Sequence, residues 1–267
     1  MQPVLAELLT IGDEILYGQI VDTNSQWMSV ALAEAGIRVV RKTSVGDQEE
    51  EILKALNDAE ERADIVLITG GLGPTNDDLT KPCLVKYFNT RLIINEEALA
   101  EVTAFFKSRG RELTELNRQQ AALPANCVKI TNVMGTAPGM WFHERGKVFV
   151  SMPGVPHEMK RMMTDLVIPK LQQTFALPVI YHKIIRTVGI GESFLAEKIK
   201  PWESRLPTHI KLAYLPSLGE VKLRLTGTGK SKETLEIETD QLARELDPLV
   251  GEYIYGYGED PLPVVLG

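Results

Sequence analysis

The sequence predicts an α/β protein with a mostly parallel sheet, followed by a smaller α+β domain. Short apolar runs alternate with amphipathic segments through the first part of the chain, and beyond residues 175–178 the order of strand and helix signals changes. The length of 267 residues fits about two domains, since a domain averages roughly 150 residues. We therefore expect a first domain over residues 1–175 and a second over 179–257.

In the first domain, apolar runs that end at polar or glycine-rich loops are expected to be buried strands. Asp22 and Asp47 stand where helix caps are expected, the latter with Glu50 three residues on, as in a capping box. The alternation of strand and helix implies parallel strands joined by crossovers. The expected strands cover 5–11, 37–45, 65–68, 139–143 and 148–152, and the expected helices cover 22–35, 47–59, 80–88, 96–108, 112–121 and a segment from 156 onward.

The second domain has a different order of elements. Residues 179–188 are expected to form a strand and 193–200 a helix. A strand pair at 210–215 and 221–225 is joined through a Pro-Ser-Leu-Gly turn cluster, and a helix at 231–246 and a strand at 253–255 follow. The order β-α-β-β-α-β is a split βαβ pattern, which indicates an α+β domain.

Composition excludes several classes of protein. The formal charge of −7 and the lack of a basic half argue against a dedicated nucleic-acid binder. No apolar run approaches the about 20 residues that span a bilayer, and the N-terminus lacks a signal peptide. The two cysteines, Cys83 and Cys127, form no CxxC pair, and so few thiols fit a reducing compartment. We expect a cytoplasmic protein with no membrane partner.

The strongest chemical feature is the glycine-rich loop that follows the third strand. It runs Thr69-Gly70-Gly71-Leu72-Gly73-Pro74-Thr75-Asn76-Asp77-Asp78-Leu79-Thr80 and leads into a helix. Glycines at a strand end let the backbone approach a phosphate, and consecutive N–H groups can point at it. Two carboxylates beside a phosphate require a cation, and Mg²⁺ binds through carboxylates plus substrate phosphates. The alternative interpretation is a turn with two acidic residues near a helix N-terminus.

Other strand ends carry polar loops that would reach the same edge of a parallel sheet. Gly12, Asp13 and Glu14 follow the first strand, with Asp22-Thr23-Asn24 downstream, and Asp47 follows the second. Helix capping is the alternative explanation for Asp22, Thr23 and Asp47. Two further small-residue loops, 135–139 and 151–159, precede and follow the last strands of the domain, and the second contains His157 and Glu158. No GxSxG nucleophile elbow and no Walker A sequence are present.

Together these loops resemble the competence/damage-inducible CinA family, whose first domain belongs to the molybdopterin-binding superfamily. The matching stretches are 10–19 with 22–24, 45–47, 69–81, 117–121, 135–139 and 152–159. The resemblance implies a three-layer α/β/α first domain with a nucleotide or pterin cleft, and a KH-like second domain. It also implies metal-dependent hydrolysis of ADP-ribose to AMP and ribose 5-phosphate. The superfamily's motif aspartates fall on Asp47 and Asp78.

The resemblance extends to nearly the whole chain. Residues 171–267 contain no GxxG, the backbone clamp of nucleic-acid-binding KH domains. Many family members carry a third domain that deamidates nicotinamide mononucleotide. Residues 258–267 are expected to begin a linker toward such a domain, so that activity is not assigned. The family resemblance also implies a homodimer.

These observations define a predicted site for a nucleotide substrate and a divalent cation (Mg²⁺, Mn²⁺ or Co²⁺). The hypothesis is a nucleotide pyrophosphatase acting on ADP-ribose or a similar nucleoside diphosphate. The alternatives are an adenylyltransferase for a pterin substrate and a non-catalytic nucleotide-binding module. The predicted catalytic residues are Asp47, Asp78 and Glu14, and the predicted metal ligands are Asp47, Asp77 and Asp78. The predicted substrate-binding residues are Gly12, Asp13, Asn24, Thr69, Gly70, Gly71, Gly73, Pro74, Thr75, Thr80, Gly135, Pro153, Gly154, Pro156 and Glu158.

Overall fold

The structure is a computed structural model that describes residues 3–75 and 77–258. The chain divides into two compact units, and the boundary falls between Leu177 and Pro178. Nearly all of the linker expected at 258–267 lies outside the described residues.

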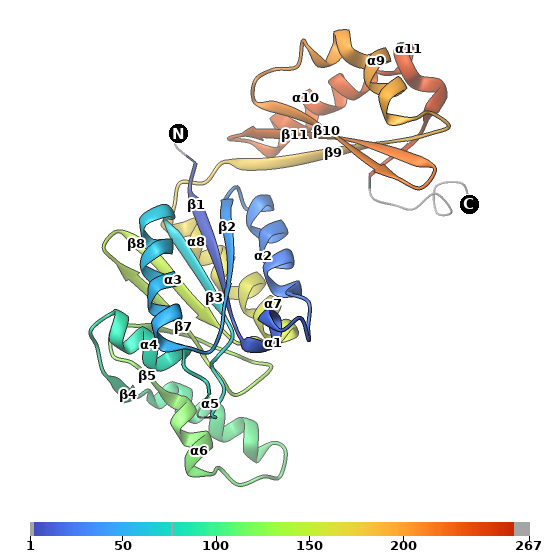
Figure 1. Ribbon diagram of the computed structural model, residues 1–267. Helices are drawn as coiled ribbons and strands as arrows, with labels where there is room; N and C mark the ends of the chain where they lie inside the picture. Colours follow the sequence, from blue (N-terminus) through green and yellow to red (C-terminus); the bar gives the residue numbers. More distant parts are fainter. Residues whose placement is uncertain (1–2, 76, 259–267) are drawn as a thin grey trace. The chain divides into compact units, whose positions relative to one another are not determined.

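The first unit is built on a six-stranded sheet (Figure 1). The four strands β2, β1, β3 and β8 run parallel to one another, while β7 pairs antiparallel with β8 and β6 antiparallel with β7. The sheet is therefore mostly parallel, as predicted. In sheet order the strands are β2 (Arg38–Val45), β1 (Leu5–Ile11), β3 (Ile65–Thr69), β8 (Lys147–Met152), β7 (Gly139–Glu144) and β6 (Val128–Ile130).

Helices cover both faces of this sheet, because its strands are apolar on both sides. Along β1, Ala6 and Leu8 belong to one core cluster, and Leu9 and Ile11 belong to the other. The predicted three-layer α/β/α architecture is confirmed. One face carries α2 (Thr23–Glu34), α7 (Pro156–Met162) and α8 (Ile168–Thr174), joined by a π-helical segment at Met163–Val167, and the other carries α3 (Glu49–Arg62) and α4 (Thr80–Tyr87).

The remaining elements of this unit are short, except for α5. The helix predicted at 112–121 begins three residues later than expected and ends differently: α6 is α-helical, and a 3₁₀ helix at Gln119–Ala121 follows it. The chain leaves the helix there because the next residues pair with β4. The elements are α1 (Asp13–Leu16), β4 (Leu92–Ile94), α5 (Glu96–Lys107), α6 (Glu115–Arg118) and β5 (Ala122–Pro124).

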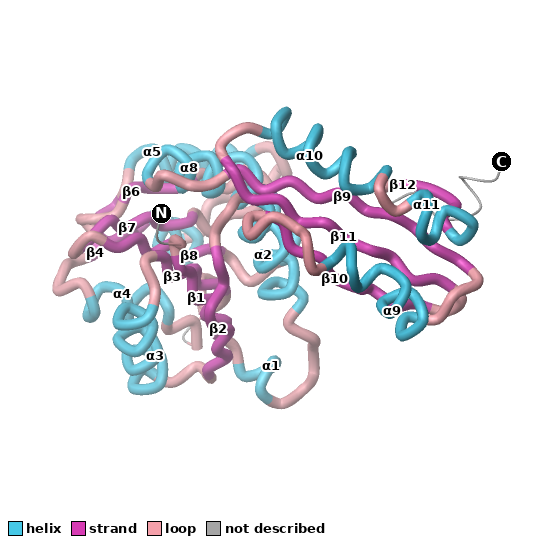
Figure 2. The backbone as a smooth tube through the Cα atoms, turned by 90° about the horizontal axis from the view of Figure 1, so that it is seen from above, coloured by secondary structure: helices cyan, strands magenta, loops and turns pink. Residues whose placement is uncertain are grey.

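The second unit has the predicted order β-α-β-β-α-β. Its four strands form an antiparallel sheet in the order β10-β11-β9-β12 (Figure 2). Alternate residues of β11, such as Leu223 and Leu225, pack with Trp202 of α9 and Leu246 in one core. The elements are β9 (Val179–Val188), α9 (Glu192–Glu203), β10 (Ile210–Ser217), β11 (Glu220–Gly229), α10 (Lys232–Arg244), α11 (Asp247–Val250) and β12 (Ile254–Tyr257).

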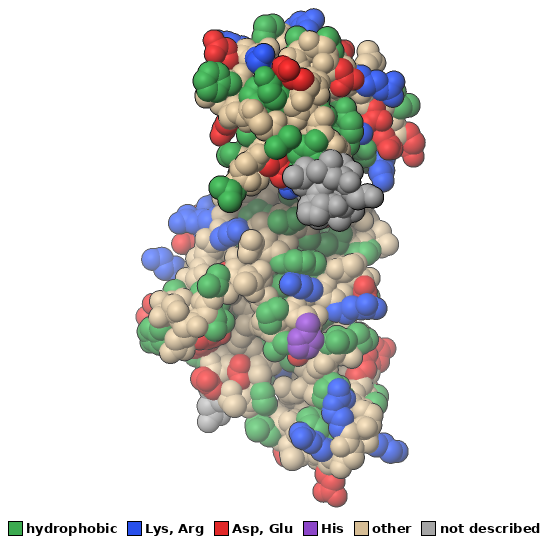
Figure 3. All heavy atoms as spheres, turned by 90° about the vertical axis from the view of Figure 1, so that its right-hand side faces the viewer, with side chains coloured by type: hydrophobic (Ala, Val, Ile, Leu, Met, Phe, Trp, Pro, Cys, Tyr) green, Lys and Arg blue, Asp and Glu red, His purple; other side chains and the backbone are tan. Residues whose placement is uncertain are grey.

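Among the described residues, no helix combines the length and apolar character needed to cross a membrane. On the face drawn in Figure 3, acidic and basic side chains are interspersed with apolar ones.

Candidate active site

The glycine-rich turn after β3 has a backbone that only glycine can adopt. Gly70 and Gly71 have φ angles of +105° and +61°. A Cβ at Gly70 would lie 2.0 Å from the Ile11 carbonyl oxygen, and a Cβ at Gly71 would lie 2.3 Å from Oγ1 of Thr80. The Thr80 hydroxyl donates to the Gly70 carbonyl at 2.8 Å and fixes the turn from behind. Gly70 therefore allows the turn to pack closely against the end of β1, and Gly71 allows it to pack against the start of α4.

Asp78 holds the second half of this turn. Its Oδ1 accepts a hydrogen bond from the Gly73 N–H at 2.8 Å, and its Oδ2 accepts from the Thr75 N–H at 2.9 Å and from the Thr75 hydroxyl. Within the described part of the chain, the N–H groups of Gly71 and Leu72 make no hydrogen bond. The turn is thus preformed, with two backbone donors free to bind an anion.

Asp13 and Asp47 join the loops that follow β1 and β2. The Asp13 N–H donates to Oδ2 of Asp47 at 3.1 Å, and the Asp47 N–H donates to Oδ1 of Asp13 at 3.2 Å. The predicted capping box at Asp47 is wrong, because Gln48 is the N-cap residue of α3 and the Asp47 carboxylate faces Asp13 instead. Burial, followed by the charges of Asp13, Glu14 and Asp77, raises the pKa of Asp47, and the hydrogen bond from Asp13 opposes that rise.

Asn24 at the start of α2 connects two further strand ends. Its Nδ2 donates to the Gly154 carbonyl at 2.7 Å and to Oγ1 of Thr69 at 3.3 Å. The Thr69 hydroxyl in turn donates to the Pro153 carbonyl at 2.9 Å. A Cβ at Gly154 would lie 3.3 Å from Cα of Gly70, so the loops after β3 and β8 are in close contact. This network fixes the floor of the site.

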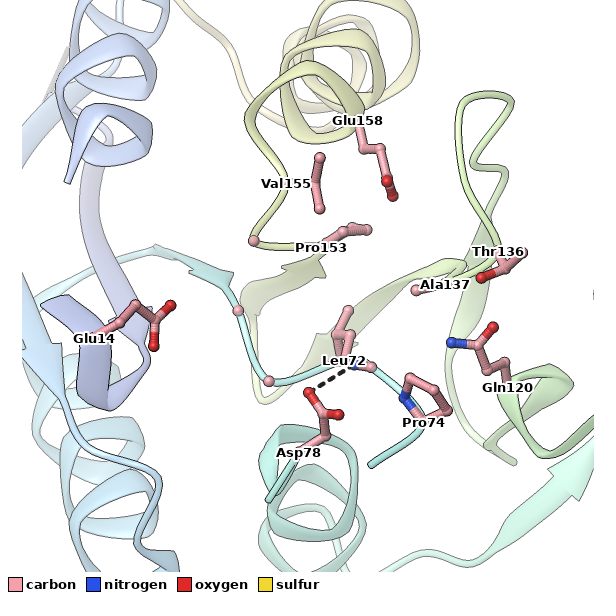
Figure 4. Close-up of a pocket in the computed structure, with 14 residues that line it drawn as sticks. Glu14, Leu72, Pro74, Asp78, Gln120, Thr136, Ala137, Pro153, Val155 and Glu158 are labelled. Atoms are coloured by element: carbon pink, nitrogen blue, oxygen red, sulfur yellow. Dashed lines mark hydrogen bonds between the residues drawn. The ribbon is translucent and has the colours of Figure 1, made fainter. Parts of the chain in front are cut away.

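These loops enclose a cavity of about 500 Å³ at the carboxyl ends of the parallel strands (Figure 4). A recess of about 80 Å³ adjoins it and shares Glu14, Gly70 and Gly154 with it. The residues that line the 500 Å³ cavity are Glu14, Gly70, Gly71, Leu72, Gly73, Pro74, Asp78, Gln120, Thr136, Ala137, Pro153, Gly154, Val155 and Glu158.

Two carboxylates face the cavity from opposite sides, Glu14 and Glu158 (Figure 4). The Glu158 carboxylate accepts a hydrogen bond from Nδ2 of Asn132 at 2.6 Å. A Cβ at Gly135 would lie 2.3 Å from Oε2 of Glu158, so glycine is required there for the carboxylate to keep its place. The Glu14 carboxylate lies over Gly12, where a Cβ would be 2.6 Å from Oε2.

The acidic residues do not form a complete metal cage. In residues 3–75 and 77–258, no group of three or more His, Cys, Asp or Glu side chains is placed to hold a metal ion. Mg²⁺ is commonly held by one or two carboxylates together with substrate phosphates. Asp13 and Asp47 supply adjacent carboxylates, and no basic side chain forms an ion pair with either in the described structure. The donors therefore fit a cation site that a phosphate ligand completes.

Comparisons with known proteins agree with this architecture. The family model described as "Probable molybdopterin binding domain" matches residues 7–173, and the "Damage-inducible protein CinA KH domain" model matches 182–256. A solved structure of the protein CinA with unknown function from Thermoplasma acidophilum is 35% identical, with a TM-score of 0.58, and the match covers 65% of this chain and 99% of that one. The chain belongs to the CinA family.

Relatives described as CinA-like proteins match nearly the whole chain. The protein from Cytophaga hutchinsonii is 50% identical over 99% of this chain and 63% of its own length. The protein from Flavobacterium psychrophilum is 47% identical over 98% of this chain and 63% of its own length. The chain thus spans less than two thirds of the length of these CinA relatives.

The structure of this CinA-family chain brings most of the predicted site residues together, in two groups. The first group lines the cavity or its recess: Glu14, Asn24, Thr69, Gly70, Gly71, Gly73, Pro74, Asp78, Pro153, Gly154, Pro156 and Glu158. The second group lines neither and supports the loops from behind or beside them: Gly12, Asp13, Asp47, Thr75, Asp77, Thr80 and Gly135. Asp77 is exposed, and a hydrogen bond to Thr75 is the main reason why its pKa is lowered.

Five residues that line the cavity are missing from the predicted set, namely Leu72, Gln120, Thr136, Ala137 and Val155. All of them fall within or next to the stretches that carry the CinA resemblance. Gln120 is the most informative of them. The resemblance to the CinA family over residues 117–121 pointed to this segment, but which of its side chains faces the cavity depends on the 3₁₀ turn.

Proposed function

We propose that the first unit hydrolyses the diphosphate of ADP-ribose, or of a similar nucleoside diphosphate, to AMP and ribose 5-phosphate with a divalent cation. The observation that supports this most is a single cavity at the strand ends, where a preformed glycine turn lies beside carboxylates without basic partners. A turn with free N–H groups favours phosphate oxygens. The nearby carboxylates would repel the same phosphates unless a cation lay between them.

In this proposal the chain's own residues bind, orient and exchange protons. The N–H groups of Gly71 and Leu72 bind the diphosphate, and Asp78 keeps the turn in shape. Asp47 and Asp78 are proposed to hold the cation, and the diphosphate supplies further oxygen ligands. That cation, when bound, withdraws charge from the phosphoryl oxygens.

Glu14 is proposed to orient the attacking water and accept its proton, because it lines the cavity on the side of the acidic loops. The water oxygen forms a bond to one phosphorus, and the bond from that phosphorus to the bridging oxygen breaks. The bridging oxygen leaves with the other phosphate, so one water is consumed and two monophosphates form. Glu158, on the opposite side, is the competing base.

The test is release of AMP and ribose 5-phosphate from ADP-ribose by the purified chain with Mg²⁺, Mn²⁺ or Co²⁺, each measured by chromatography. Glu14→Gln is expected to lower the rate about 100-fold or more, and Glu158→Gln far less, since a general base contributes about 10²–10⁴-fold. The reverse order would reassign the base to Glu158. No AMP with any of the metals would overturn the proposal.

A second candidate is adenylyl transfer to a pterin, favoured by the description of the family model that matches the first unit. Incubation with ATP and molybdopterin separates the two, because transfer yields an adenylated pterin and no free AMP. Binding of ADP-ribose without either product would indicate a non-catalytic nucleotide-binding module. We also propose that the protein is cytoplasmic and forms a homodimer. Light scattering after size-exclusion chromatography would check the homodimer.

A further inference from the structure

One cavity residue has a buried polar group without partners. Gln120 is 5% exposed and lines the 500 Å³ cavity, and its Oε1 is buried with no hydrogen-bond partner. Its amide nitrogen also makes no hydrogen bond to the described residues. The backbone carbonyl of Gln120 accepts a hydrogen bond from Nζ of Lys81 at 3.2 Å. Figure 4 shows the amide pointing toward the cavity between Pro74 and Ala137.

The neighbouring glutamine shows what an ordinary amide does in the same turn. Gln119 is exposed, and its Nε2 donates to Oε1 of Glu115 at 2.7 Å. Buried side-chain amides in folded proteins almost always find partners, since an unpaired buried polar group is costly. The unpaired amide of Gln120 is therefore explained best by a ligand that supplies both a donor and an acceptor.

The walls around this amide are apolar. Leu72, Pro74, Ala137, Pro153 and Val155 line the same cavity, and Thr136 is the one hydroxyl among its lining residues. Apolar walls with one or two directed polar groups are typical of a site for a planar ring. Glu14 lies on the far side of the cavity from Gln120, and Asp78 and Glu158 lie between them (Figure 4). The cavity thus has one part suited to phosphate and another suited to a base.

Building on the proposed function, we propose that Gln120 recognises the adenine of the substrate. Adenine presents its 6-amino N–H beside a ring nitrogen, a donor next to an acceptor, and the glutamine amide pairs with both. The terminal torsion of glutamine is broad and roughly two-fold, so Oε1 can turn to the amino group while Nε2 donates to the ring nitrogen. Gln120 is then the residue that selects the base, and the glycine turn binds the phosphates of the nucleotide.

The test compares two nucleotides that differ only in the 6-amino group, AMP and purine riboside 5′-monophosphate, by calorimetry with the full chain and Mg²⁺. The wild-type protein is expected to bind AMP about tenfold more tightly, the upper range for a neutral hydrogen bond. Gln120→Ala should remove that preference and leave the affinity for ribose 5-phosphate unchanged. Gln119→Ala is the matched control and should keep the preference. Circular dichroism and thermal unfolding check that both variants fold.

Three outcomes would overturn the inference: equal binding of the two nucleotides by the wild-type protein, an AMP preference that survives Gln120→Ala, or tighter binding of GMP or a pterin that depends on Gln120. Because these are equilibrium measurements with a nucleotide that has no diphosphate, they are independent of hydrolysis. Failure to release AMP from ADP-ribose would overturn the proposed function and leave base recognition standing.

Discussion

The carboxylates at the strand ends of the first unit differ from several charged side chains of the second unit's sheet. In the first unit, the carboxylates of Asp13, Glu14, Asp47 and Asp78 gather at the strand ends, and within the described residues none forms an ion pair with a basic side chain. In the second unit, several charged side chains of the sheet are paired, as in Arg186–Glu220 and Lys183–Asp240, each at 2.6 Å.

Sheet topology produces this difference. The parallel strands β1, β2, β3 and β8 all end at one edge, so their four following loops converge there. An antiparallel sheet sends successive loops to opposite edges. Charged residues of the second unit therefore meet in separate pairs rather than around a common cavity. Glu220 of β11 lies near Arg186 of β9, and Lys183 of β9 pairs with Asp240 of α10.

The largest effect is expected from Asp78→Asn. The substitution removes the charge that accepts hydrogen bonds from Gly73 and Thr75 and that is proposed to hold the cation. AMP release from ADP-ribose should fall about 100-fold or more, since such a group acts on transition-state charge worth several kcal/mol. The measurement is the initial rate at saturating metal.

The matched control is Asp165→Asn. Asp165 is exposed on the helix after β8, forms an ion pair with Arg161, and lies outside the cavity lining. It should change the rate by less than about twofold, because surface ion pairs contribute little. If the rate of Asp78→Asn stays near the wild-type value, Asp78 has no role in the reaction, and its lack of a basic partner does not indicate a site.

An intermediate effect, on stability alone, is expected from Glu220→Gln in the second unit. The Arg186 side chain is buried and donates two hydrogen bonds to the Glu220 carboxylate at 2.6 and 3.1 Å. Loss of the charge should lower the free energy of unfolding of this unit by about 2–4 kcal/mol, because a buried guanidinium is left without its counter-charge. AMP release should not change. Urea unfolding followed by Trp202 fluorescence, in a Trp27→Phe, Trp141→Phe background, reports this unit alone.

The control for this pair is Glu238→Gln. Its partner, His209, is 40% exposed, so the substitution should lower the free energy of unfolding by less than about 1 kcal/mol. The hydrogen bonds from Arg186 are the main reason why the pKa of Glu220 is lowered. The stabilisation is therefore complete above the ordinary carboxyl pKa of 4.5 and is lost as the pH falls through the lowered folded value. Equal costs for the two variants at pH 7 would mean that burial does not distinguish the pairs.

The sequence predicts what depends on local pattern. The strands at 5–11 and 65–68 were recognisable from their apolar runs, and the glycine turn from its position directly after a strand. The site residues on the loops after β1, β3 and β8 follow from these assignments, because the carboxyl ends of parallel strands meet.

Features that depend on tertiary contacts could not be predicted in this way. Asp47 precedes a helix and has the sequence of a cap, yet its carboxylate accepts a hydrogen bond from Asp13, 34 residues away. The exposure of Gln119 and the burial of Gln120 follow from a 3₁₀ turn whose exit is set by the pairing of β5 with β4. Helical periodicity over 112–121 gives no information on either, because it assumes a geometry that the chain abandons at Arg118.

The smallest effect is expected from Asp47→Asn, measured by thermal unfolding in a buffer with a metal chelator. Burial, followed by the charges of Asp13 and Glu14, raises the pKa of Asp47, so its ionised form is disfavoured in the folded protein. The folded protein then binds this proton more tightly than the unfolded chain does. Its stability falls as the pH rises from the ordinary pKa of 3.8 through the raised folded value, and stays lower above it.

The asparagine keeps the acceptor for the Asp13 N–H and removes the charge, so at pH 7 it should raise the melting temperature by about 1–3 °C, the shift that a change below 1 kcal/mol produces in a chain of this size. The difference should vanish near pH 3, where Asp47 is protonated. Added Mg²⁺ should stabilise the wild-type protein more than the variant, because a cation offsets the repulsion that the variant has already lost. If Asp47→Asn has a lower melting temperature than the wild-type protein at pH 7, the Asp47 charge stabilises the loops. Asp47 would then act as the paired charges of the second unit do.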